Sequence, residues 1–405
     1  MNLIKMKNGI QRRIRKYGCK VYAATFAKIV RIRHGKVYVD NFIGKGYGGN
    51  PKYIVDEILK KKPDWEIVWA VNDLNTPMPD GVRKVKYGTL ACAWEQASAE
   101  FWIDNVRNAH LVKKRKGQIY LHTSHGAFGF KGVEKFVENK LSHEYVEAAK
   151  YDGSITDAII AENRFKVEQY KKYYWLSDNT EILKTGMLEP GYSLSDEELQ
   201  NRKSILREKY GMTQKDFVIL YAPTFRNEDV ADVYNINFKR VLDCLEKKTG
   251  RGCKIIVRFH PNVNLEKVND VIDQNDIRIM DGNNFPDEME RYILSDMLIT
   301  DYSSVMYYFS LLNKPVFIFA KDYEAYKKER TLLLRPEDTP YPFAQNIEEF
   351  EQCVIEYDQK KYQEKVCKFY ENFEIYREKE PVGKAVNWMI MHADKENSNE
   401  KRNMG

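Results

Sequence analysis

The chain is poor in the features that mark several common classes of protein. No apolar run among its 405 residues approaches the roughly 18 residues that cross a bilayer, and no signal peptide is evident. Six cysteines are scattered without a CxxC pair, which favours reduced, mostly buried thiols and gives no zinc spacing. Walker A, GxSxG and HExxH motifs are absent, as is any carboxylate cluster suited to a divalent metal.

A strong excess of one charge is also missing. The formal net charge is +6, and no long basic stripe with interleaved aromatic residues occurs, so we expect no nucleic-acid partner. The mild excess suits anionic small molecules or an anionic membrane surface. Residues 1–20 hold seven basic and no acidic residues among apolar ones. This segment is either an interfacial helix on anionic lipid or a solvated basic terminus.

Strand-like and helix-like patterns alternate along most of the chain. This order predicts an α/β fold of parallel sheets with helices on both faces. Apolar runs at 37–42, 66–71 and 119–124 predict strands in the first half, and residues 90–107 have a helical pattern. The second half has strand-like runs at 217–223, 254–261, 297–301 and 315–320. A break at 190–205 separates the halves, so we expect two doubly wound domains facing one cleft.

We therefore divide the chain into four parts. Residues 1–35 are a basic segment suited to membrane contact, and residues 36–195 form the first domain. Residues 196–390 form the second domain and include a C-terminal helix, and residues 391–405 are a polar tail. Such a tail, with few apolar residues, is expected to be disordered.

Unusual polar clusters follow four of the predicted strands. They are His125-Gly126, Thr224-Phe225-Arg226, Arg258-Phe259-His260-Pro261 and Asp301-Tyr302-Ser303-Ser304. In open parallel sheets, ligands bind beyond the carboxyl ends of the strands, so the coincidence of the four clusters predicts a binding site.

Each cluster allows a functional and a structural interpretation. A helix that begins near Ser303 offers a seat for phosphate, but Asp301 and the serines also suit a simple helix cap. Arg258 and His260 share one side of a strand and suit a phosphate, and the structural alternative is an arginine salt bridge with a histidine bonded to the backbone.

The remaining candidates are more open. Arg226 adds a charge beside Thr224 or is an exposed loop residue. His125 precedes a glycine-containing turn that ends at Lys131 and fits a general base, whereas His122 is expected to be structural. The residues alone thus predict a cleft for a phosphate-rich, nucleotide-linked ligand with a histidine on each side.

Several longer stretches carry a family resemblance. They are NFIGKGYGGNPKYI, HGAFGFKGVEK, EILKTG, LYAPTFRN, RFHPN and SDMLITDYSSVMYYFSLLNKPVFIFAKDYEAY. Over residues 36–390 the chain resembles the CDP-glycerol glycerophosphotransferase family of teichoic-acid and capsule polymerases and primases. The resemblance implies a GT-B-like fold and transfer of glycerol or ribitol phosphate from a CDP-alditol to an acceptor hydroxyl, with release of CMP. It implies no cofactor or metal, a lipid-linked or polymeric glycan acceptor, and a cytoplasmic protein peripheral to the bacterial plasma membrane.

The resemblance also implies roles for the site residues. His125 takes the proton of the acceptor, while His260, Arg258 and the helix start at Ser303-Ser304 hold the pyrophosphate. The remaining donor-binding candidates are Thr224, Arg226 and Asp301, and Gly126 and Lys131 are further candidates.

The chain departs from the family pattern at three places. Ser124 stands where tryptophan is usual, Ala127 stands where glycine or threonine is usual, and MLEPGYSL follows EILKTG without the usual Pro-Arg. Two alternatives therefore stay open: a GT-B glycosyltransferase that uses a nucleotide sugar, and a non-catalytic scaffold for capsule assembly.

Overall fold

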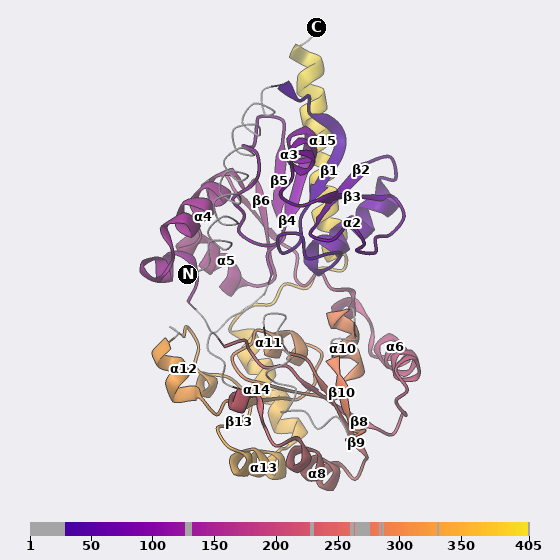
Figure 1. Ribbon diagram of the computed structural model, residues 1–405, viewed down its shortest axis with the longest axis vertical. Helices are drawn as coiled ribbons and strands as arrows, with labels where there is room; N and C mark the ends of the chain where they lie inside the picture. Colours follow the sequence, from indigo (N-terminus) through magenta and orange to yellow (C-terminus); the bar gives the residue numbers. More distant parts are fainter. Residues whose placement is uncertain are drawn as a thin grey trace, which may run out of the picture. The chain divides into compact units, whose positions relative to one another are not determined.

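The computed structural model describes residues 29–125, 132–226, 231–259, 263, 276–282, 285, 287–329 and 332–403. Its chain forms two compact units. The first contains the described residues up to His125, together with Glu134–Leu188 and the C-terminal part from Tyr376. The second is built mainly from Glu189–Ile375. Figure 1 shows one sheet in each unit.

The first unit is built on a seven-stranded sheet in which every neighbouring pair is parallel. The order is β3-β2-β1-β4-β5-β6-β7. The strands are β1 (Arg33–Val39), β2 (Glu66–Val71), β3 (Val82–Lys86), β4 (Ala99–Asp104), β5 (Ile119–His122), β6 (Ala158–Ala161) and β7 (Glu181–Lys184). The helices are α2 (Gly49–Lys61), α3 (Leu90–Ser98), α4 (His143–Ile155) and α5 (Arg164–Tyr173).

Side chains of the first sheet are buried on both faces. Along β1, Val37 and Val39 belong to the cluster that includes Ile54 and Ile58 of α2. Tyr38, between them, points to the opposite face and packs in a cluster with the buried residues of α3. Burial on both sides explains why the inner strands are mostly apolar, whereas the edge strands β3 (VRKVK) and β7 (EILK) are partly exposed and carry charged residues.

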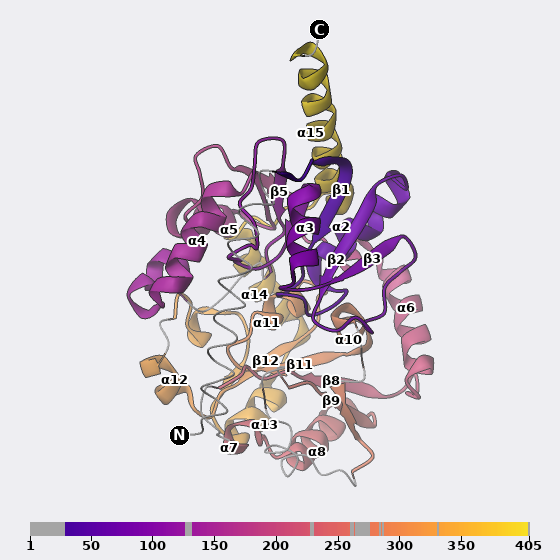
Figure 2. The ribbon, with the colours of Figure 1, turned by 45° about the horizontal axis from the view of Figure 1, so that its top comes forward.

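The second unit contains a six-stranded parallel sheet in the order β10-β9-β8-β11-β12-β13. Its strands are β8 (Phe217–Tyr221), β9 (Cys253–Val257), β10 (Ile279–Asp281), β11 (Met297–Thr300), β12 (Val316–Phe319) and β13 (Phe343–Ala344). Its helices are α6 (Asp196–Lys209), α7 (Ala231–Tyr234), α8 (Phe238–Thr249), α10 (Glu288–Leu294), α11 (Val305–Ser310), α12 (Tyr323–Glu329), α13 (Ile347–Glu356) and α14 (Gln359–Glu371). Helices α8 and α13 pack side by side against one face (Figure 2).

The expected helix over residues 90–107 is wrong in its second half. Helix α3 ends at Ser98, and β4 begins at the next residue, Ala99, without a connecting loop. All six residues of β4 are buried, so the strand shows no alternation of polar and apolar residues. A fully buried strand of this kind cannot be distinguished from a buried helix by periodicity.

The C-terminal helix differs from the expectation in both position and length. Helix α15 (Pro381–Asn403) belongs to the first unit, not the second, and it continues through most of the expected polar tail. Its apolar residues Ala385, Val386 and Met389 are buried in the cluster that includes α2. Lys384 Nζ also donates to the carbonyl oxygen of Lys184, at 2.8 Å, at the end of β7. Sequence order alone does not show which sheet a terminal helix covers.

Two further expectations concern the whole chain. The five cysteines that the structure describes form no disulfide, and Cys92 and Cys253 are buried while Cys367 is exposed. Within the described ranges, every helix is too short or too polar to cross a lipid bilayer.

Candidate functional site

Each sheet has a point at which the strand order reverses. In the first unit it lies between β1 and β4, and in the second unit between β8 and β11. Ligands of open parallel sheets bind outside the carboxyl ends of the strands at such a point. Thr224 and Arg226 follow β8 and Asp301 follows β11, so these predicted residues lie together at the reversal of the second sheet.

Arg226 and Asp301 form a buried ion pair there. The Nη2 atom of Arg226 lies 2.8 Å from Asp301 Oδ2, and both side chains are 4% exposed. Asp322, at the end of β12, accepts from Arg226 Nε at 2.6 Å, and Thr224 O accepts from Nη1 at 2.6 Å. Arg226 is therefore held by its neighbours inside the protein and is not an exposed loop residue.

Asp301 is held from the main chain as well. Its Oδ1 atom accepts from the backbone N–H of Thr224 at 2.8 Å and of Tyr302 at 2.5 Å. Burial alone would lower the pKa of Arg226, but the charges of Asp301 and Asp322 raise it above its ordinary value. The pair thus ties the two strand ends together and fixes the turn after β11.

Three hydroxyl groups stand close to this pair in sequence. Thr224 is 9% exposed, and its Oγ1 atom has no hydrogen-bond partner within the described part of the chain. Ser303 and Ser304 are partly exposed at the start of α11, and Ser304 makes no side-chain capping bond. A buried hydroxyl without a partner is costly unless a ligand or water satisfies it, so Thr224 is a candidate for direct contact.

Arg258 follows β9 at the same edge of the sheet. It is partly buried, and its Nη1 atom donates to the carbonyl oxygen of Phe259. Burial and the like charge of Arg291 lower the pKa of Arg258, and the charges of Glu288 and Asp281 oppose this. The predicted residues His260, Gly126 and Lys131 lie outside the described residues.

His125 lies beyond the carboxyl end of β5 in the first unit. Its Nδ1 atom is 2.5 Å from the carbonyl oxygen of Asn105, which directly follows β4. Because a carbonyl oxygen only accepts, Nδ1 carries the proton, and Nε2 of the neutral ring is left as an acceptor. The ring also packs edge-on against Phe42, at 5.1 Å between centroids.

The environment of His125 favours the neutral ring. The residue keeps contact with solvent, yet desolvation of its inner side lowers its pKa, against the opposing effect of the bond to Asn105. The charge of Lys166 lowers the pKa further. A neutral imidazole with a free Nε2 is the form that a general base requires.

His122, three residues earlier, is buried as expected of a structural residue. Its Nδ1 atom accepts from the backbone N–H of Ser124 at 3.0 Å. Burial lowers the pKa of His122 to about 3, so the ring stays neutral. His122 is buried at the end of β5, whereas His125, three residues later, is exposed. Of the two, His125 is therefore the one that an acceptor can reach.

A buried cluster in the first unit has the composition of a metal site. Oxygen and nitrogen atoms of Asp104, His110 and Asp152 lie within 4.8 Å of one another. Arg107 donates to Asp152 Oδ2 at 2.6 Å, and Tyr120 donates to Asp104 Oδ1 at 2.7 Å. Because an arginine and a phenol already use carboxylate oxygens, the cluster is better explained as an internal network that supports the strand ends.

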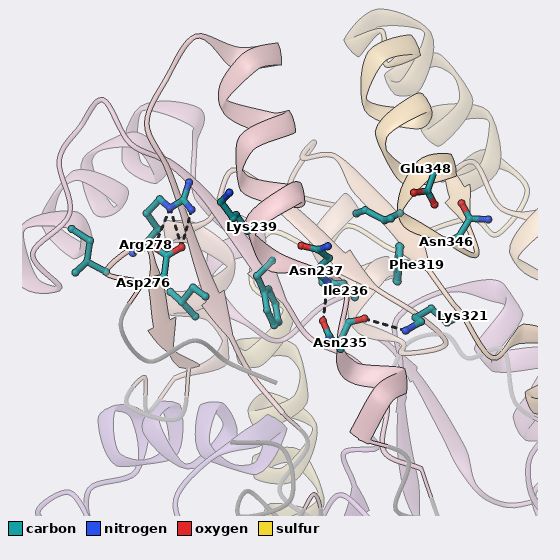
Figure 3. Close-up of a pocket in the computed structure, with 14 residues that line it drawn as sticks. Asn235, Ile236, Asn237, Lys239, Asp276, Arg278, Phe319, Lys321, Asn346 and Glu348 are labelled. Carbon is teal, nitrogen blue, oxygen red and sulfur yellow. Dashed lines mark hydrogen bonds and ion pairs between the residues drawn. The ribbon is translucent and has the colours of Figure 1, made fainter. Parts of the chain in front are cut away.

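A pocket of about 910 Å³ lies elsewhere in the second unit. Figure 3 shows Asn235, Asn237 and Lys239 on one side of it and Lys321 and Asn346 on another. Lys321 Nζ donates to the carbonyl oxygen of Asn235 at 3.3 Å. Of the predicted site residues that the structure describes, none lines this pocket.

Sequence reasoning missed Asp322 and Asn105. Asp322 follows β12, so the rule that selected the four clusters applied to it too, and its acidic character was the available signal. Asn105 stood inside the wrongly expected helix, which hid its position at a strand end.

The two units, each a parallel sheet with polar residues beyond the strand ends, define a two-domain α/β protein with a candidate ligand-binding edge on each sheet. The chain belongs to the CDP-glycerol:poly(glycerophosphate) glycerophosphotransferase family, whose model matches residues 22–390. The match spans residues of both units. The family expected from the sequence is confirmed.

Similar proteins include two teichoic acid poly(glycerol phosphate) polymerases. The one from Staphylococcus epidermidis is 28% identical over 357 residues, which cover 83% of this chain and 48% of the relative. The one from Bacillus spizizenii is 27% identical over 408 residues, with coverage of 94% and 98%. The chain thus spans about half the length of the first relative and nearly all of the second.

Solved structures show the same fold. A variant of the wall teichoic acid polymerase TagF superposes with a TM-score of 0.80 at 24% identity, covering 98% of this chain and 97% of the solved chain. MnaA of S. aureus, in a structure with UDP, superposes with a TM-score of 0.56 at 16% identity, covering 89% and 97%. The expected α/β fold with two Rossmann-like, GT-B-like halves is confirmed.

Proposed function

We propose that this chain transfers an alditol phosphate, with glycerol phosphate as the first candidate, from a CDP-alditol to an acceptor hydroxyl. The observation that carries the proposal is the family match over residues 22–390, which spans both reversal points. The two curated relatives described above are poly(glycerol phosphate) polymerases. A ribitol-phosphate primase of B. spizizenii is 27% identical over 248 residues, so CDP-ribitol is the second candidate donor.

The reaction makes one oxygen–phosphorus bond and breaks another. The acceptor oxygen attacks the β-phosphorus of the donor in line, and CMP leaves with the bridging oxygen. His125 takes the acceptor proton on Nε2, because Nδ1 is occupied by its bond to Asn105. General-base assistance of this kind contributes about 10²–10⁴ in rate.

The second unit supplies the donor site in this proposal. The Thr224 hydroxyl, the Arg258 guanidinium and the hydroxyls of Ser303 and Ser304 hold the pyrophosphate, and His260 stabilises the charge that leaves on CMP. Arg226 and Asp301 act by fixing the strand ends, since their charged atoms are paired with each other. Preorganised donors can stabilise phosphoryl transfer electrostatically, so we propose that no metal or cofactor takes part.

The acceptor and location complete the proposal. The acceptor is the free hydroxyl of a growing teichoic-acid-type polymer or of its lipid-linked start. We expect the enzyme to work at the cytoplasmic face of the plasma membrane, with residues 1–20 on anionic lipid. Capsule synthesis is a second setting with the same chemistry.

The test is nucleotide release by the purified chain with a lipid-linked acceptor. CDP-glycerol, CDP-ribitol and a UDP-sugar are offered separately, each with and without EDTA. CMP from a CDP-alditol, unchanged by EDTA, is the expected result. UDP from the sugar donor would replace the proposal by a glycosyltransferase, and loss of CMP release in EDTA would overturn metal independence. Absence of any release, together with no CDP-glycerol binding by calorimetry, would favour a non-catalytic scaffold.

A further inference from the structure

The loop after β1 has an unusual backbone. Phe42 and Ile43 have φ angles of 46° and 59°, in the left-handed region that residues other than glycine rarely adopt. Such residues persist only where their surroundings hold them in place. Gly49, at the far end of the loop, also has positive φ (59°), and a Cβ there would lie 2.9 Å from Asn41 Oδ1.

Side chains near β1 and β2 hold this loop. Asp40 Oδ1 accepts from the backbone N–H of Gly44 at 2.7 Å. Asn41 Nδ2 donates to the carbonyl oxygen of Gly46 at 2.9 Å, and Asn72 Nδ2 donates to that of Ile43 at 2.6 Å. The loop is therefore fixed in one shape at the reversal point of the first sheet.

Asn105 joins this loop to His125. Its Nδ2 atom donates to Asn41 Oδ1 at 2.8 Å, and its Oδ1 atom accepts from the backbone N–H of Phe42 at 3.0 Å. The carbonyl oxygen of the same residue accepts from His125 Nδ1. Asn105 is completely buried, so these bonds are shielded from competition by water.

We propose that Asn105 is a positioning residue for the reaction: its amide fixes the loop after β1 while its carbonyl oxygen fixes the tautomer and direction of His125. The inference rests on the proposed function, in which Nε2 of His125 receives the acceptor proton. The inference adds that the loop after β1 and His125 keep a fixed position relative to each other, because both are bonded to Asn105. The edge-on contact of Phe42 with the His125 ring connects the loop and the histidine directly as well.

The proposal predicts which ring nitrogen of His125 carries the proton. A neutral histidine in water carries its proton mainly on Nε2, and the opposite Nδ1–H form needs an acceptor such as the Asn105 carbonyl oxygen. The charged and titratable groups that act on the ring are Lys166 of α5 and His122 of β5, through the field that each produces. A negative charge placed at residue 105 would add a third and would favour the protonated ring.

The test compares Asn105→Asp and Asn105→Ala with wild type. In ¹⁵N spectra of histidine-labelled protein, assigned with His125→Gln, we expect the Nδ1–H form in wild type. Asn105→Ala keeps the main-chain carbonyl but loses both bonds of the amide to the loop, so we expect that carbonyl to shift away from Nδ1 and a mixture of tautomers to appear. Asn105→Asp keeps the size of the side chain and the oxygen that accepts from the Phe42 N–H. It is the variant to measure if Asn105→Ala does not fold. For Asn105→Asp we expect kcat to fall at least tenfold, KM for the donor to stay within twofold, and the acid limb of the pH–rate profile to move to higher pH.

Gln118→Glu is the matched control. Gln118 is also a buried amide, and its Nε2 atom donates to the carbonyl oxygen of Ala99, but it precedes β5 at the opposite edge of the sheet. The same change of charge there should leave the acid limb and the tautomer in place.

The outcomes separate the two proposals. An unchanged tautomer in Asn105→Ala, or a kcat for Asn105→Asp within twofold of wild type at a pH above the acid limb, would overturn the role of Asn105. A wild-type protein that releases no CMP from any CDP-alditol, in an assay that a known family polymerase passes, would overturn the proposed function. The tautomer measurement does not depend on activity, so it decides the link between Asn105 and His125 in either case.

Discussion

The two reversal points of this protein use the same edge of the same kind of sheet in different ways. In the first unit, amide side chains, main-chain carbonyls and the His125 imidazole join the strand ends around the loop after β1, beside the charged network of Asp104, Arg107 and Asp152. In the second unit, they are joined by a buried arginine between two carboxylates. In the proposed reaction, the neutral groups around His125 leave its Nε2 able to accept a proton, and the charged framework of Arg226, Asp301 and Asp322 holds the strand ends beside the donor site. The fold sets where each candidate site lies, at the reversal of the strand order, and the residues that join the strand ends set its charge.

Removal of the base should have the largest effect on activity. His125→Ala should lower kcat by about 10²–10⁴ while leaving the protein folded, because the residue contributes a proton acceptor from the surface of the first unit. The measurement is initial-rate CMP release. His143→Ala is the control, since His143 is an exposed residue at the start of α4. Equal activity of the two variants would break the assignment of base chemistry to the first unit.

The charged framework should dominate stability. Arg226→Met should lower the free energy of unfolding by about 3–5 kcal/mol, because two carboxylates would be left buried without their cation. Arg335→Met is the control, as Arg335 pairs with Asp338 on the surface and such pairs contribute about 0–1 kcal/mol. Urea unfolding of both variants gives the comparison. A similar loss of unfolding free energy in Arg226→Met and Arg335→Met would show that the buried ion pair contributes no more to stability than the surface pair.

The first unit also contains a buried acid, Glu162, whose effect on stability should depend on pH. Burial raises the pKa of Glu162 to about 7, against an opposing effect of Lys166. A raised pKa in the folded state means that the stability contributed by the protonated acid is complete below pH 4 and is lost as pH rises towards 7. Glu162→Gln should therefore increase stability at pH 8, by up to about 3 kcal/mol, and change it little at pH 4. Thermal unfolding at the two pH values checks this, and an equal effect at both would contradict the assignment.

Thr224→Val should have the smallest effect, and it should separate binding from folding. The Thr224 hydroxyl has no partner among the described residues, so its loss should leave the unfolding free energy unchanged or raise it, by up to about 1–3 kcal/mol. If it binds the pyrophosphate, KM for the CDP-alditol should rise by about ten- to a hundredfold, as expected for a hydrogen bond to a charged group worth about 1.5–3 kcal/mol. Thr249→Val is a control, since the Thr249 hydroxyl donates to the carbonyl oxygen of Leu245 within helix α8. An unchanged KM in Thr224→Val would remove this residue from the donor site.

Strand ends could be predicted only where the strand itself was recognised. The apolar run before Asp301 is short and ends in polar residues, so both the strand and its site were found. The run before Asn105 continues a helix without a break, so strand and site were missed together. Asp322 shows a different limit, because its partner Arg226 is 96 residues away along the chain. No local pattern connects residues at that separation.

The sequence by itself determined the α/β class, the family and most of the strand ends that carry polar residues, because hydrophobic periodicity and short motifs are local properties. Only the tertiary structure decided which of those residues are paired and which keep an atom for a ligand. It buried Arg226 between two acids, left the Thr224 hydroxyl without a partner among the described residues, and set the tautomer of His125 through Asn105. It also placed α15 on the first sheet. These outcomes depend on contacts between distant segments, whose energies no single stretch of sequence contains.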